Sequence, residues 1–320
     1  MSIMYFLANM KRKSFILIAL LILSLLYEEV SGQIIADHTV VSLYDDIPQQ
    51  WIDSVKTKLV WVIGMSHGNA YFRGAELLEQ LDTTFQVDIW YHIDPPAEQD
   101  TALRLGRPQW GRESFWTSQD GIDNFNENTV AIQNETGNQY DYIAFGWSYQ
   151  SVWENDLGGG IDPVYNVRWA GSTQAGPDGN KRWGLDSGDS ILTENRVNMD
   201  TYLDAVEQFN QYYIDQNYET SFFFSNGIVD DDEGTEMGFQ RELKNQHVRD
   251  YVDRKDDNTL FLDYADILVY SDSGDLHTAD WDDGGTLRPH QQLHPDNDLD
   301  YDENFNIIPP GDDVNEDHIG

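Results

Sequence analysis

The sequence LVWVIGMSHG, residues Leu59 to Gly68, joins a continuous apolar run to a glycine-bounded turn. The β-branched and aromatic residues 59–63 are typical of a strand in the middle of a parallel sheet. Apolar residues at helical spacing follow over 70–81, which predicts a strand–turn–helix unit. The turn would place Ser66 at the carboxyl end of a strand and near a helix N-terminus, where backbone N–H groups can stabilise a developing anion. Ser66 is therefore a candidate nucleophile.

Strand-like and helix-like segments alternate along the rest of the chain. Strands are expected over 85–93, 141–145, 220–224 and 259–263, and helices over 48–56, 199–213 and 239–252. Long irregular stretches are expected over 94–140 and 151–198, and the tail from 272 to 320 reads as loop-like. The alternation predicts an α/β fold in which helices cover both faces of a parallel sheet, a three-layer α/β/α arrangement of the flavodoxin-like type.

Composition excludes several classes of partner. The 320 residues include 57 acidic and 19 basic side chains, a formal net charge of −38. Such a chain is repelled by the phosphates of nucleic acids and by anionic membranes, so we expect neither as a partner. Cysteine is absent, which excludes disulfides, thiol catalysis and cysteine-ligated zinc. We expect a monomer.

The N-terminus resembles a secretory signal peptide. Basic residues 11–13 precede an apolar run over 15–27 and then the small residues of Val-Ser-Gly at 30–32. The run is shorter than the roughly 20 residues that a membrane-spanning helix needs, although a retained membrane anchor is the alternative. We expect cleavage after Gly32, a single domain over 33–320, and an extracellular or periplasmic location.

Polar side chains follow several of the predicted strands. The carboxyl ends of parallel strands meet at one edge of the sheet, where doubly wound folds bind their ligands. Acyl transfer needs a serine activated by a histidine, together with donors for an oxyanion. Adjacent side chains diverge, so His67 is expected to point away from Ser66. The candidates are Ser66, His67, Trp147, Ser148, Gln150, Asn226 and, near the C-terminus, His318.

The early Gly-Met-Ser turn and the late histidine together resemble the SGNH, or GDSL-like, hydrolase superfamily. The resemblance covers residues 37–320 and implies an α/β/α hydrolase in which Ser66 is the nucleophile and His318 the general base. The family also has a glycine donor to the oxyanion after its second strand. Gly111 is the first candidate for that position, and Gly106 is the second.

A narrower resemblance is to a group of secreted bacterial SGNH-like proteins. The shared runs are ADHT (36–39), SH (66–67), DPVY (162–165), RWAGS (168–172) and DHIG (317–320). In that group a further helix follows the last run. The resemblance therefore implies that the sequence is a piece of a longer domain.

The sequence departs from the family pattern at its catalytic positions. The turn reads Gly-Met-Ser-His in place of Gly-Asp-Ser-Leu, and Asn315 stands three residues before His318, where the family has aspartate. Asp317 or Asp313 could orient the histidine, or the site could be a Ser–His dyad. Residues 146–150, Gly-Trp-Ser-Tyr-Gln, replace the family's Gly-x-Asn-Asp, which leaves Ser148 or Gln150 as the side-chain donor. These departures leave open the alternative that the protein is an inactive or repurposed relative of the family.

The acidic tail offers candidate metal ligands. Oxygen-bearing residues alternate over 296–303 as calcium ligands do, but the glycine and glutamate of an EF-hand loop are missing. His290, His294 and Asp296 could contact zinc, although nothing in the sequence closes that geometry. We expect no cofactor and leave calcium open.

The resemblance implies a secreted serine esterase, and we expect it to act on O-acyl esters of carbohydrates. The alternative is a non-catalytic extracellular module that binds glycans through tryptophans on its long loops, such as Trp147 and Trp169. A lipid-ester hydrolase is a third option, against which the polar, aromatic loops count.

Overall fold

A computed structural model of the chain describes residues 33–64, 68–92, 94–106, 114–147, 159–171, 182–227, 229, 234–255, 259–297, 300, 301, 307 and 308. Its main sheet has seven parallel strands in the order β1-β7-β6-β5-β2-β4-β3. The strands are β1 (Ile34–Ala36), β2 (Leu59–Gly64), β3 (Val87–Trp90), β4 (Leu103–Gly106), β5 (Tyr142–Gly146), β6 (Ser221–Ser225) and β7 (Leu260–Leu262).

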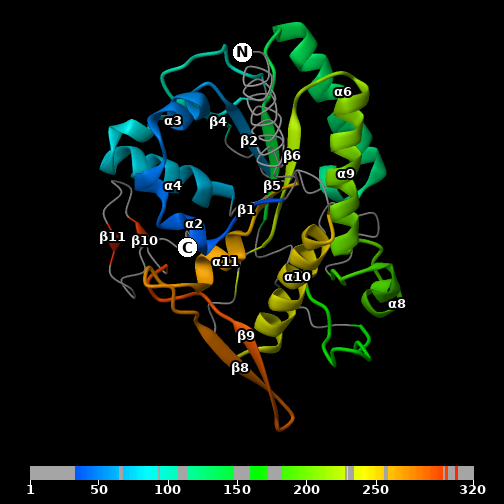
Figure 1. Cartoon of the computed structure of the whole chain (residues 1–320). Coiled ribbons are helices and arrows are strands. Elements are labelled where there is room, and N and C mark those ends of the chain that lie inside the picture. The colour runs from blue at the N-terminus through cyan, green and yellow to red at the C-terminus, as the bar shows by residue number, and fades with distance from the viewer. Residues whose placement is uncertain are drawn as a thin grey trace, which may run out of the picture.

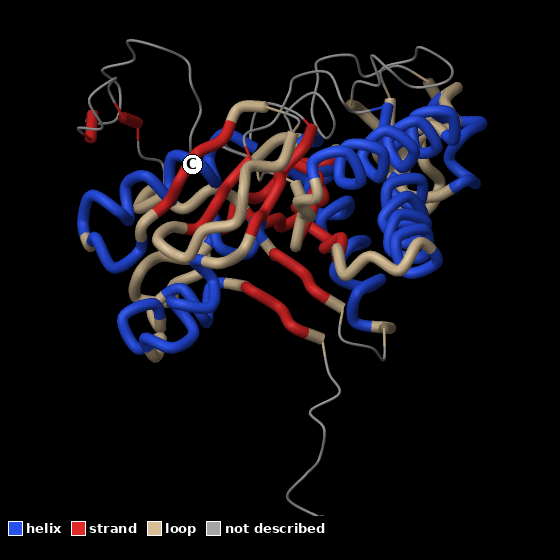
Figure 2. The backbone as a smooth tube through the Cα atoms, turned by 90° about the horizontal axis from the view of Figure 1, so that it is seen from above, coloured by secondary structure: helices blue, strands red, loops and turns tan. Residues whose placement is uncertain are grey.

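Helices flank this sheet on both sides (Figures 1 and 2). The α-helices are α2 (His38–Val41), α3 (Gln49–Lys56), α4 (Gly68–Leu81), α5 (Ser114–Thr117), α6 (Gln119–Thr136), α8 (Ser190–Thr193), α9 (Met199–Asp215), α10 (Glu236–Asp253) and α11 (Tyr264–Val269). Short 3-10 helices span η1 (Tyr44–Asp46), η2 (Thr83–Phe85) and η3 (Ser187–Asp189). The arrangement confirms the predicted three-layer α/β/α fold.

The residue pattern of β2 explains the three layers. Trp61 and Ile63 belong to a large core on one face of the sheet, which includes buried side chains from α5, α6, α9 and α10. Val62 belongs to a smaller core on the other face, where it packs with Phe72 of α4. Because successive side chains of a strand point to opposite faces, a strand buried on both faces must be apolar throughout.

Aromatic rings fill the larger core. Trp61 stacks on Tyr140 with ring centroids 4.9 Å apart, and Trp116 of α5 meets Phe209 of α9 edge-on at 4.8 Å. Both geometries suit the charge distribution of aromatic rings. Much of the aromatic content of the chain therefore serves to pack α5, α6 and α9 against the sheet.

The stretch 94–140 corrects a prediction. It contains strand β4 and helices α5 and α6, whereas the sequence suggested an irregular loop. The strand predicted over 85–93 is also shorter than expected, because Thr83 to Phe85 form a 3-10 turn and β3 covers only Val87–Trp90. Strand β4 lies between β3 and β2, so it and not β3 is the neighbour of β2. Strand β1 also precedes β2, although the sequence predicted no strand before residue 59.

The tail is also more ordered than predicted. Strands β8 (Thr278–Asp283) and β9 (Thr286–Gln291) form an antiparallel hairpin closed by Gly284 and Gly285, both with positive φ. The hairpin extends away from the main sheet at the lower end of the view in Figure 1. Two-residue strands β10 (Asp300–Tyr301) and β11 (Ile307–Ile308) pair further along.

Candidate functional site

The topology puts a switch point between β2 and β5. The chain leaves β2 through α4 toward β3 and β4 on one side, and then crosses through α5 and α6 to β5 on the other side. In open α/β sheets, ligands bind in the crevice at the carboxyl ends of the strands where such a reversal occurs. Ser66 follows β2 in the sequence and Ser148 follows β5, so the two strands that lead to these residues are the ones that meet at the switch point.

Backbones approach one another closely at the switch point because glycines occupy it. Gly64 and Gly146 end their strands as paired residues. Gly64 has φ of +142°, and a Cβ placed on it would lie 2.4 Å from the carbonyl oxygen of Gly146. A Cβ on Gly146 would lie 3.0 Å from the Cα of Gly68, the first residue of α4. A side chain at Gly64 would therefore displace β5, and Gly146 lets the N-terminus of α4 lie close against β5.

Most of the predicted catalytic residues lie outside the described residues. The structure gives the strand before and the helix after the Gly-Met-Ser-His turn, but not the turn itself. The predicted residues outside the description are Ser66, His67, Gly111, Ser148, Gln150, Asn315, Asp317 and His318. Gly106 is described: it ends β4 beside β2, and the rings of Trp61 and Trp90 pack where its side chain would stand.

The tryptophans proposed for sugar stacking are buried. Trp147 follows β5, and its Nε1 donates to the Ser225 carbonyl oxygen at 3.1 Å. Trp169 is also buried, and its Nε1 donates to a carboxylate oxygen of Asp162 at 3.1 Å. Both rings therefore pack inside the protein and present no face to solvent.

Asn226, after β6, is fully buried and has partners at both ends of its amide. Its nitrogen donates to Asp263, and its oxygen accepts from the backbone N–H of Ala265 at 2.9 Å. Arg249 of α10 also binds Asp263, through Nε at 2.7 Å. Asn226 thus joins the ends of β6 and β7 in an ionic network, which is a structural role.

Sequence reasoning missed a buried lysine. Lys244 of α10 is fully buried, and its ammonium donates to the carbonyl oxygen of Ala170. Burial and, to a smaller extent, the charge of Arg241 lower the pKa of Lys244 to about 7, although Asp189 opposes the change. Its position in the predicted helix 239–252 gave no sign of burial, because lysine on a helix is usually solvated.

Asp37, His38 and Asp266 form a cluster that could hold a metal ion. One potential ligand atom from each lies within 4.8 Å of the others. The cluster joins the ends of the neighbouring strands β1 and β7, and His38 Nδ1 contacts Asp266. Tyr270 stacks on the His38 ring at 3.5 Å and fixes its plane. One imidazole and two carboxylates suit a divalent transition metal.

The metal ligands predicted in the tail are not gathered in this way. Among the described residues, His290, His294 and Asp296 form no set of three converging ligand atoms. His290 is buried in β9, and His294 Nδ1 accepts from the backbone N–H of Asp296 at 3.0 Å. Much of the acidic run 296–303 lies outside the described residues.

Comparisons with protein-family models, curated proteins and solved structures find no match for this chain. Within the described ranges, none of the helices has the length and apolar character needed to cross a membrane. Function must therefore be inferred from the residues and their arrangement.

Proposed function

We propose that this protein is a secreted serine hydrolase that cleaves O-acyl esters of carbohydrates, with Ser66 as its nucleophile. The observation that supports the proposal is the junction of β2 with α4 at the switch point of a doubly wound parallel sheet. A serine in that junction has a strand end on one side and the N–H groups of a 14-residue helix on the other.

The proposed reaction follows ordinary serine-esterase chemistry. Ser66 Oγ forms a bond to the acyl carbon while His318 removes its proton. Backbone N–H groups of Ser66 and Gly111, with Ser148 or Gln150, stabilise the tetrahedral oxyanion. The bond to the sugar oxygen then breaks, and His318 returns the proton to that oxygen. Water releases the acid by the same two steps.

A fluorophosphonate probe tests the proposal directly. The full chain is treated with the probe, and mass spectrometry locates any adduct. We expect one adduct on Ser66, none in Ser66→Ala, and loss of acetylated-oligosaccharide hydrolysis in the same variant. Ser54→Ala is the matched control, because Ser54 is exposed on α3 and should change nothing.

A folded protein that takes up no probe and hydrolyses no acyl ester would contradict the proposal and favour a non-catalytic binding module. Circular dichroism of each variant establishes that the protein is folded. Hydrolysis of lipid esters without hydrolysis of carbohydrate esters would keep the serine chemistry and change the substrate class.

A further inference from the structure

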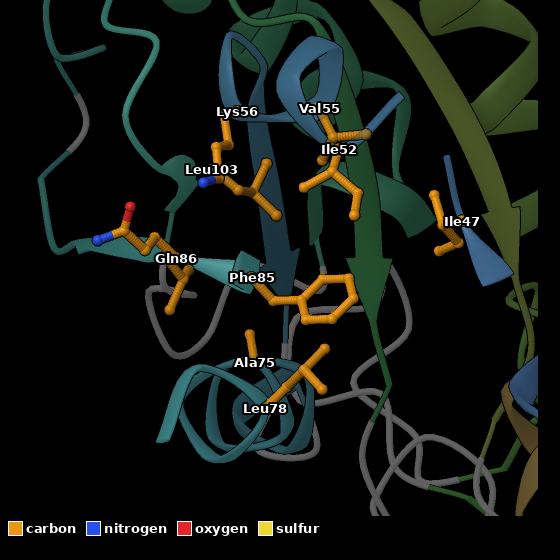
Figure 3. Close-up of a pocket in the computed structure, with 10 residues that line it drawn as sticks. Ile47, Ile52, Val55, Lys56, Ala75, Leu78, Phe85, Gln86 and Leu103 are labelled. Atoms are coloured by element: carbon orange, nitrogen blue, oxygen red, sulfur yellow. The ribbon is translucent and has the colours of Figure 1, made fainter. Parts of the chain in front are cut away.

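An apolar pocket lies between α3 and α4, far from the switch point in the topology (Figure 3). Ile52 and Val55 of α3 face Ala75 and Leu78 of α4 across it. Phe85 projects between the two helices. Residues just before β3 and at the start of β4 complete the wall, so the pocket lies at the amino ends of these strands. The candidate hydrolase site is at the opposite, carboxyl edge.

The size of the pocket sets the size of its ligand. Its volume is about 150 Å³. A closed apolar cavity of about that volume, lined by leucine, isoleucine and phenylalanine, binds one benzene molecule. The apolar part of the lining here is of the same kind, but this pocket is open to solvent, and Val55 is 49 % exposed at its margin. A ligand that covered this surface would gain hydrophobic free energy.

A charged side chain lies at the margin of the pocket. Lys56, at the end of α3, is on the left of the view in Figure 3, whereas the Gln86 amide points further left, away from the apolar side chains. Within the described part of the chain, the Lys56 ammonium has no hydrogen-bond or ion-pair partner. An ammonium at the margin of an apolar chamber complements an anionic head group.

We propose that this pocket binds a small carboxylic acid whose apolar body is about the size of a benzene ring. The ring or short alkyl chain lies between α3 and α4, and the carboxylate accepts a hydrogen bond from the Lys56 ammonium. Lys56 is half-buried, and its positive charge beside the apolar side chains locally offsets the repulsion that the net charge of −38 exerts on an anion. This binding does not depend on the proposed hydrolase activity.

Three ligands separate the contributions of ring and charge. Benzoate carries both, benzyl alcohol carries the ring without the charge, and acetate carries the charge without the ring. Ligand-observed NMR titrations with the full chain should show saturable binding of benzoate, weaker binding of benzyl alcohol and none of acetate.

Two variants place the binding in the pocket. Lys56→Met keeps the length of the side chain and should weaken the affinity for benzoate by about tenfold, the effect of losing one charge-assisted contact. The affinity for benzyl alcohol should not change. Ala75→Phe fills the pocket and should abolish binding of both. Leu81→Phe is its control, because Leu81 is on the same helix, 84 % exposed, and outside the pocket.

Three results would overturn the proposal: no saturable benzoate binding, benzoate binding that survives Ala75→Phe, or equal loss of both ligands in Lys56→Met. Because Lys56→Met changes only the margin of the pocket, it gives an answer even if Ala75→Phe does not fold.

Discussion

At the scale of single residues, Gly64 carries the tightest constraint near the candidate site. Its φ of +142° is accessible to few residues other than glycine, and any Cβ would collide with Gly146 and Phe145. We expect Gly64→Ala to lower the free energy of unfolding by about 1–3 kcal/mol, measured by urea denaturation.

Gly74→Ala is the matched control for that substitution. Gly74 lies inside α4, and a Cβ there would meet nothing within 4 Å. Alanine is the better helix former, so Gly74→Ala should stabilise the protein by about 0.5–1 kcal/mol. If both variants changed stability equally, the close approach of β2 and β5 would be refuted.

Lys244 makes a prediction about pH. Burial lowers its folded-state pKa to about 7, whereas a lysine in the unfolded chain titrates near about 10.4. Between these values the unfolded chain binds the extra proton, so the free energy of unfolding rises with pH. We expect the stability of wild type relative to Lys244→Met to increase from pH 6 to pH 9, measured by urea denaturation at each pH.

Lys255→Met is the control for this pH effect. The pairing of Lys255 with Glu207 outweighs desolvation and raises its pKa. Stability that comes from a raised lysine pKa is fully present below the unfolded value and is lost only at higher pH. The difference between wild type and Lys255→Met should therefore stay constant between pH 6 and pH 9. A constant difference for Lys244→Met as well would mean that its amine is solvated.

At the scale of elements, the sequence predicted the strands and helices that have a continuous apolar run or a regular amphipathic spacing. The run of β2 is apolar because both of its faces are covered, and α9 has the amphipathic spacing of a surface helix. Strand β4 was not predicted because it has only four residues and one of them is Arg104, a charged residue that is buried. The guanidinium donates to the carbonyl oxygens of Thr57 at 2.7 Å and Pro96 at 3.2 Å. Such compensation comes from distant backbone and leaves no local pattern.

Helix α6 could have been found from its ends. Ser118 Oγ accepts from the Gly121 N–H at 3.2 Å, and Gly137 terminates the helix in the left-handed conformation with φ of 74°. Both are standard helix signals. The segment between them is polar, and its buried hydrophobic residues are Ile122 and Phe125. Two such residues are too few to show the helical spacing of an apolar face.

The candidate site, too, could be predicted from the sequence only in part. Its place at the strand ends follows from topology, which the alternation of elements predicts. The orientation of a side chain does not, because it depends on partners far along the chain. Trp147 is held by Ser225, and Asn226 by Asp263; neither pairing has a signature in the sequence.

At the scale of the whole molecule, charge is the dominant feature. The net charge of −38 makes the folded chain repel itself, because compaction brings like charges together. Helix α9 shows the effect locally. Burial raises the pKa of Asp204, and the charges of Asp200 and Glu207 raise it further. The three carboxylates lie on successive turns of one helix face.

Screening this repulsion should stabilise the protein. The Debye length falls from about 10 Å at 0.1 M salt to about 3 Å at 1 M. We expect the midpoint of thermal unfolding at pH 7 to rise by roughly 2–3 °C between these NaCl concentrations, a gain of about 1–2 kcal/mol for a domain of this size. Repeating the scans near the sequence pI of 4.1 removes the net charge. At that pH the rise of the unfolding midpoint with salt should largely disappear. An equal rise at both pH values would contradict the prediction, because it would come from the general effect of salt on apolar surface.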